Sequence, residues 1–142
     1  MTTHKHLSLQ SPTTVLNSEL NSLASAALSS ASAAYDNSSG LYIFCGVEYT
    51  IAAQGSARAA GAALALFHSV SLTGTAQDLT VESPLFDSQT LDAATTARIH
   101  SRYGMWIPPS ATIKYALQNN TGQAFASSGN TVKIVVWYTQ SV

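Results

Sequence analysis

The side chains best suited to metal or acid–base chemistry in this sequence are its four histidines. His4 and His6 are two residues apart, so an extended chain would place both imidazoles on one side, where they could share a metal ion. Two ligands on a polar terminal segment are too few for a specific site, and we expect no metal there. His68 lies in an apolar stretch, which is typical of a half-buried histidine whose hydrogen bonds are satisfied.

The fourth histidine, His100, stands between two arginines. Arg98, His100 and Arg102 alternate along the chain, so in a strand all three side chains share one face. That face could bind an anion or a carboxylate-bearing surface of a partner. The alternative is a solvated strand face whose charges pair within the protein. Three acidic residues are available for such pairs: Asp78, Glu82 and Asp87.

No other pattern in the sequence is typical of an active site. Cys45 is the single cysteine, which excludes an intramolecular disulfide and a zinc site of several cysteines. It lies on the apolar side of its segment, and we expect an inert core thiol. Nucleophile elbows, phosphate-binding glycine loops and metalloprotease motifs are absent. We therefore predict that the protein is not an enzyme and uses no cofactor.

The composition favours association. The chain has 142 residues, enough for one domain, and only 9% of them are charged, with a net charge of −1. So few charges give little electrostatic protection against association. Either a hydroxyl-rich β domain solvates itself well, or copies of the protein or partners cover much of its surface.

Several classes of partner and location are disfavoured. The basic residues form no face that could neutralise phosphates, so we expect no nucleic-acid partner. No apolar run approaches the ~20 residues needed to span a bilayer, and none after Lys5 suits a secretory signal. We therefore expect synthesis in the cytoplasm and no membrane partner.

The predicted elements that position these residues begin at the N-terminus. Residues 1–12 are polar and predict a flexible arm, followed by a single β-sandwich domain over residues 13–142. A short amphipathic helix is predicted from about Val15 to Leu28. Its apolar residues recur at helical spacing: Leu16, Leu20, Leu23 and Ala27. The alanine- and serine-rich segment 24–34 either continues this helix or opens the first strand.

After Gly40 the apolar period changes to two, which indicates strands. One long strand buries alternate residues: Leu41, Ile43, Cys45, Val47, Tyr49 and Ile51. Further strands are predicted over 62–71, 79–82, 95–101, 111–117 and 131–140, with a loop over 84–92. The last has apolar residues on both faces, as expected for a central or interface strand. Short strands joined by turns predict a mainly β fold, a β-sandwich or jelly roll.

Aromatic residues supply the other candidate contacts. Tyr42 and Phe44 fall on the side of their strand opposite the core set, and Val135 and Trp137 lie on the final strand. Exposed aromatics would form a sugar-stacking platform or a protein interface. We favour an interface with copies of the same chain, because no charged or amide groups can be placed beside them. The candidate partner or oligomer interface is Tyr42, Phe44, Arg98, His100, Arg102, Val135 and Trp137.

Stretches near both ends of the chain resemble small virion proteins of tailed bacteriophages. At the start these are TTVLNSELNSL (13–23) and YDN (35–37). Towards the end they are IPPS (107–110), LQNNTGQA (117–124) and SGNTV (128–132). These motifs are structural and include no catalytic residue.

The resemblance implies a capsid decoration, or cement, protein of jelly-roll type. Such a protein clamps neighbouring major capsid subunits from outside, so its expected partners are the major capsid protein and copies of itself, and its expected location is the outer surface of the virion. The middle of the chain, 57–92, departs from the family in being alanine-rich and lacking an Asp-Gly-rich loop. The alternative is a tail-associated carbohydrate-binding or adhesin module.

Overall fold

The computed structural model describes residues 4–6, 10–38, 42–71, 78–107, 111–137 and 139–141. Within these ranges the chain forms ten strands and one short 3₁₀ helix, η1 (Ser18–Leu20). The strands are β1 (His4–His6), β2 (Thr13–Leu16), β3 (Tyr35–Asp36), β4 (Phe44–Ile51), β5 (Ala63–Ser71), β6 (Leu85–Thr90), β7 (Arg98–Trp106), β8 (Thr112–Asn120), β9 (Thr131–Trp137) and β10 (Thr139–Ser141).

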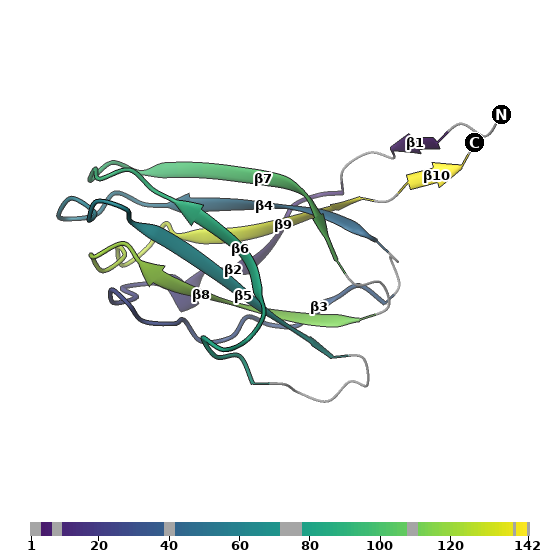
Figure 1. The fold of residues 1–142 in the computed structure, drawn as a ribbon, viewed down its shortest axis with the longest axis horizontal. Coiled ribbons are helices and arrows are strands. Elements are labelled where there is room, and N and C mark those ends of the chain that lie inside the picture. Colours follow the sequence, from purple (N-terminus) through teal and green to yellow (C-terminus); the bar gives the residue numbers. More distant parts are fainter. Residues whose placement is uncertain are drawn as a thin grey trace.

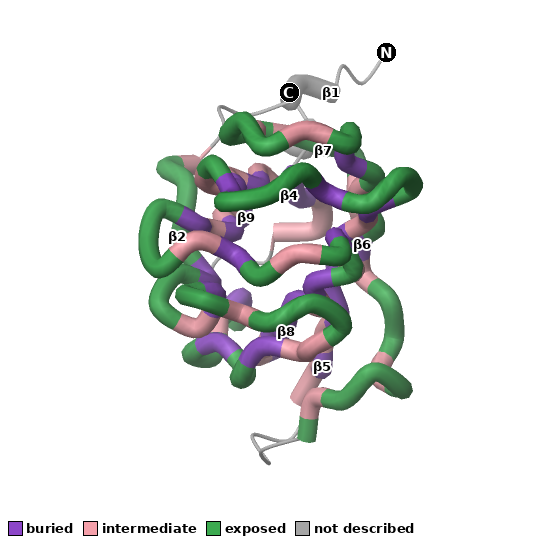
Figure 2. The backbone as a smooth tube through the Cα atoms, turned by 90° about the vertical axis from the view of Figure 1, so that its left-hand side faces the viewer, coloured by how far each residue is buried: buried purple, intermediate pink, exposed green. Residues whose placement is uncertain are grey.

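Eight of these strands make two antiparallel sheets that face each other (Figure 1). One sheet has the order β2-β9-β4-β7 and the other β3-β8-β5-β6. In the view of Figure 2, β7, β4 and β9 lie above β8 and β5, with buried segments in both layers. The prediction of a mainly β protein is confirmed, and the two facing sheets are consistent with a β-sandwich.

The core follows from the period-two alternation of the strands. On β4, Cys45, Val47, Tyr49 and Ile51 are at most 1% exposed, as the sequence predicted. The residues that complete this core from the other central strands are Leu64, Leu66, Ile113, Tyr115, Leu117, Val132, Ile134 and Val136. Strand β9 lies between β2 and β4, so the prediction of a central final strand is confirmed, with its end separated as β10.

The helix predicted over Val15–Leu28 is wrong. The residues up to Leu16 pair with β9 as strand β2, and only the η1 turn is helical. Leu16 and Leu20 are fully buried, but they reach the core from a strand and a tight turn. Serine and asparagine have weak helix propensity, and Ser22 and Ala26 adopt positive φ angles, which a helix cannot include.

The serine-rich segment 24–34 is an irregular border along β8. The Ser29 N–H donates to the Leu117 carbonyl oxygen (2.9 Å), and the Ser29 hydroxyl accepts a bond from the Leu117 N–H (3.1 Å). Ser32 repeats both contacts with Tyr115, at 2.8 and 3.0 Å. Because serine hydroxyls replace backbone carbonyls here, β8 is satisfied without a regular neighbouring strand.

Two predictions between residues 79 and 92 are also wrong. Residues 79–82 form no strand, and a turn closes there with the Ser83 N–H bonded to the Thr80 carbonyl (3.0 Å). The predicted loop 84–92 contains β6, an edge strand whose polar sequence hides its pairing with β5. Two successive residues, the buried Asp87 and the partly buried Phe86, face the core at a register shift, so the expected apolar alternation is missing.

The two chain ends run side by side. Strand β1 pairs antiparallel with β10, from His4 opposite Ser141 to His6 opposite Thr139. This terminal ribbon extends away from the sandwich (Figure 1). Residues 1–3 and 7–9 of the predicted arm lie outside the described residues, and its flexibility stays a prediction.

Candidate interaction face

The side of the β2-β9-β4-β7 sheet that faces away from the core carries a group of large apolar residues. We call it the aromatic face: Phe44, Ile99, Tyr103, Trp106, Val135 and Trp137. Tyr103 is 88% exposed, Ile99 68% and Trp106 63%. Phe44 pairs with Trp106 on one side and Trp137 on the other, which brings three strands together on this face.

A shallow groove of about 170 Å³ lies on the aromatic face above Gly46, with Tyr103 and Trp137 along its sides. A Cβ atom at Gly46 would lie 2.9 Å from the Arg102 carbonyl oxygen and 3.7 Å from the Trp137 ring. The floor therefore has no room for a side chain. The Trp137 ring stacks on Phe44, with centroids 6.2 Å apart, and this contact fixes one wall.

Charge on this face is balanced internally. Glu48 and Lys133 are neighbours across β4 and β9, and their side chains form an ion pair of 3.2 Å. The other outward residues described on β4, β7 and β9 are uncharged. The aromatic face is therefore apolar and has no net charge.

The predicted trio Arg98, His100 and Arg102 lies on the opposite, inward side of β7. Arg102 pairs with Val47 and His100 with Tyr49, both core residues. The trio does share one face, as predicted, and that face turns towards the other sheet at the open edge of the sandwich, where the Arg102 side chain is still 54% exposed.

Arg102 and Tyr49 meet on one buried carboxylate. An Arg102 guanidinium N–H donates to Asp87 Oδ1 (2.6 Å), and the Tyr49 hydroxyl donates to Asp87 Oδ2 (2.8 Å). Burial, and then the bond to Asp87, raise the pKa of Tyr49 above its ordinary value. The ion pair with Asp87 that we gave as the alternative is thus present, and it ties β7 to β6 across the edge of the sandwich.

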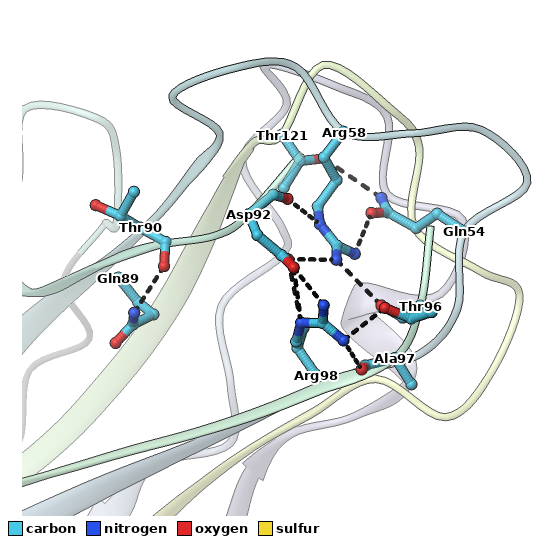
Figure 3. Close-up of polar contacts among 9 residues, drawn as sticks. All are labelled: Gln54, Arg58, Gln89, Thr90, Asp92, Thr96, Ala97, Arg98 and Thr121. Atoms are coloured by element: carbon cyan, nitrogen blue, oxygen red, sulfur yellow. Dashed lines mark hydrogen bonds and ion pairs between the residues drawn. The ribbon is translucent and has the colours of Figure 1, made fainter. Parts of the chain in front are cut away.

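Arg98 belongs to a second polar network at the loop end of the sandwich (Figure 3). Its guanidinium binds both carboxylate oxygens of Asp92 and also the Thr96 hydroxyl. Arg58 reaches the same carboxylate from the protein interior, with a fully buried side chain. The bonds to Arg98 and then to Arg58 hold the pKa of Asp92 below its ordinary value.

Arg58 was not predicted as an important residue. It donates four side-chain hydrogen bonds: to the Asp92 carbonyl, Gln54 Oε1, Asp92 Oδ1 and the Thr96 carbonyl. These contacts join three loops, because Gln54 in turn donates to Thr121 and to the carbonyl oxygens of Gln123 and Ala124. One sequence signal could have identified it, since Arg58 is the one charged residue between Glu48 and Asp78.

Two further titratable residues, His68 and Cys45, are partly or fully buried. His68 is half-buried as expected, with its ring 5.1 Å from that of Phe86, but its Nδ1 has no hydrogen-bond partner in the described part of the chain. Burial lowers the pKa of His68. Cys45 is fully buried, and burial followed by the Asp87 charge raises the pKa of its thiol to about 12. This agrees with an inert core thiol.

The structure separates the predicted contact residues into three groups. Phe44, Val135 and Trp137 lie on the aromatic face, and the basic trio lies on the inward side of β7. Tyr42 packs against the core, and its backbone is held by the Asn37 side chain (2.7 and 3.2 Å). Ile99, Tyr103 and Trp106 were not predicted as contact residues. The candidates chosen from β7 were its basic residues, which lie on the other side of this strand.

Among the residues that the structure describes, no three histidine, cysteine, aspartate or glutamate side chains gather as metal ligands. The same residues include no helix of the length and apolarity that a membrane crossing requires. No protein-family model matches this chain, and no curated protein is significantly similar to it in sequence.

Proposed function

We propose that this protein is a virion structural protein of the capsid decoration type. It binds the outside of the major capsid shell and stabilises it through protein–protein contacts, without catalysis or a cofactor and without a nucleic-acid or membrane partner. It is made in the host cytoplasm and resides on the outer capsid surface. The observation that carries this proposal is the strand order of the two sheets.

That order supports a jelly roll. From β2 to β9 the chain alternates between the two sheets at every step except the β5–β6 hairpin. Two Greek keys folded together give such a path, and the jelly roll recurs in viral capsid and lectin domains. This topology agrees with the phage virion resemblance of the terminal motifs.

The terminal ribbon supports an attachment role. Strands β1 and β10 leave the sandwich together, so they present backbone edges to a neighbouring protein (Figure 1). An extended segment of that kind can bind by strand addition. Many copies on one shell would make individually weak contacts effective.

The test compares particles assembled with and without the protein by electron microscopy. We expect additional density on the outer shell, and lower resistance of the bare shell to heat. Deletion of residues 1–12 should leave the fold intact, checked by circular dichroism, and weaken attachment. Density confined to the tail, or no density, would contradict the decoration role. Failure of the truncated protein to fold would show that the arm belongs to the core.

A second function, a tail-associated carbohydrate-binding or adhesin module, is favoured by the groove above Gly46. Tyr103 and Trp137 offer ring surfaces for a sugar, and Glu48 and Ser101 at the groove offer hydrogen-bonding groups. A glycan array distinguishes the two functions. Binding that is lost in Trp137→Ala would favour the adhesin, whereas a blank array would remove it.

A further inference from the structure

We propose that the aromatic face is the surface through which two copies of this chain associate, with Tyr103 of each copy seated in the Gly46 groove of the other. The inference rests on the proposed function for its biological role, and it deepens that function by naming the partner of this face.

Exposure gives the first argument. Tyr103, Ile99 and Trp106 are all more than half exposed on a single strand, β7. Aromatic residues are enriched at protein interfaces, and a contiguous exposed apolar patch marks a contact surface.

Shape indicates which partner fits. The face carries a projecting ring, Tyr103, and directly beside it a groove whose floor is closed to any side chain at Gly46. A two-fold contact requires a surface that complements itself, so that each copy both inserts and receives. A projecting ring and a groove on one face meet that requirement, and the two insertions occur together.

Charge supports the same partner. Since Glu48 and Lys133 neutralise each other within one copy, two such faces meet without like-charge repulsion. The centre of a protein interface is usually depleted in charged residues, and the two charges on this face, Glu48 and Lys133, form one ion pair within the copy. A strongly charged partner would find no matching charge here, whereas a second copy is equally neutral on this face and requires none.

Sedimentation velocity over a concentration series tests the proposal, together with tryptophan emission on dilution. The chain has two tryptophans, Trp106 and Trp137, and both lie on the aromatic face, so emission reports on this surface alone. We expect a dimer at micromolar concentration whose emission shifts to longer wavelength as it dissociates. Because both copies carry Tyr103, Tyr103→Ser removes two interface hot spots at once and should weaken association by about 1000-fold, about 30-fold for each.

Leu85→Ser is the matched control. Leu85 is 55% exposed, but it lies on β6 of the other sheet, so this variant should keep the dissociation constant of the natural protein. Ile99→Ser provides a second test on the face itself. The side chains of Tyr103 and Ile99 are both largely exposed, so their replacement should leave the fold intact, and circular dichroism verifies this.

Two results would overturn the proposal. One is a natural protein that stays monomeric. If the tryptophan emission of that monomer shifts only when capsid shells are added, the aromatic face binds the shell and not a second copy. The other is a dimer that is unchanged in both Tyr103→Ser and Ile99→Ser. The proposed function is judged separately by attachment to shells, so a monomer that still binds them would refute this contact and leave the decoration role standing.

Discussion

Removal of the Arg58 side chain should destabilise the protein far more than removal of Arg98, although both arginines bind the Asp92 carboxylate. The Arg58 side chain is fully buried, whereas that of Arg98 is 33% exposed. Arg58→Ala therefore leaves interior acceptors unpaired, whereas Arg98→Ala leaves acceptors that water can reach.

The magnitude follows from the four hydrogen bonds of Arg58. Asp92 is half-exposed and can be rehydrated, but Gln54 is buried and loses the partner of its Oε1. A buried acceptor left without its donor costs about 1–3 kcal/mol, and Arg58→Ala removes the donor of Gln54 Oε1 and of two backbone carbonyls, so we expect a loss of about 3 kcal/mol in the free energy of unfolding. At about 3 °C per kcal/mol for a chain of this size, Tm falls by about 9 °C.

Urea denaturation followed by fluorescence, at neutral pH and one fixed protein concentration, measures this difference. Equal m-values are required, because they show that the variants unfold between comparable states. Arg98→Ala is the control and should lose less than a third of what Arg58→Ala loses. A loss below about 1 kcal/mol for Arg58→Ala, or equal losses for the two variants, would refute the argument from burial.

Three further outcomes are expected. Cys45 should react with a thiol reagent at neutral pH only as fast as the protein unfolds, because its thiol is buried with a pKa of about 12; rapid labelling of the folded protein would contradict this. Burial lowers the pKa of His68 below its ordinary value of 6.5, so the unfolded chain binds a proton at this residue at a higher pH than the folded protein does. The free energy of unfolding should therefore be at its full value above about pH 6.5 and should fall as the pH drops towards the folded-state pKa. This part of the decline should vanish in His68→Phe. Ser32→Ala removes the acceptor of the buried Tyr115 N–H and should cost about 1–3 kcal/mol in a denaturation experiment, whereas Ser30→Ala, at an exposed neighbouring residue, should cost almost nothing.

The strands that could be predicted from the sequence are those whose pattern of apolar residues follows directly from which side of the strand is buried. Strand β4 alternates cleanly because one side of it is core. Strand β9 carries apolar residues on both sides because it is central and because Val135 and Trp137 on its outer side belong to the aromatic face. In both strands the local pattern and the tertiary position agree, so a single sequence suffices to read them.

The other elements could not be predicted from the sequence, because their conformation depends on residues that are distant along the chain. Strand β6 buries Asp87, which the sequence presents as a loop residue, and its burial is tolerated only because Tyr49 and Arg102 bind it. Ser29 and Ser32 look like weak helix residues until β8 lies beside them. Ile99 and Tyr103 alternate with basic residues, and only the register of β7 against β4 shows which set faces outward.

The terminal ribbon has a mechanical consequence. Its strands lead into β2 and β9, which are themselves paired, and the Gln10 N–H still binds the Val136 carbonyl (3.1 Å) where the ribbon joins the sandwich. A load applied to both ends together enters the sheet along two adjacent strands and does not pull them past each other. A load on one end alone shears β2 against β9, whose hydrogen bonds run perpendicular to the strands and resist it together. Anchoring through both termini would therefore let the sandwich bear tension without losing its edge strand.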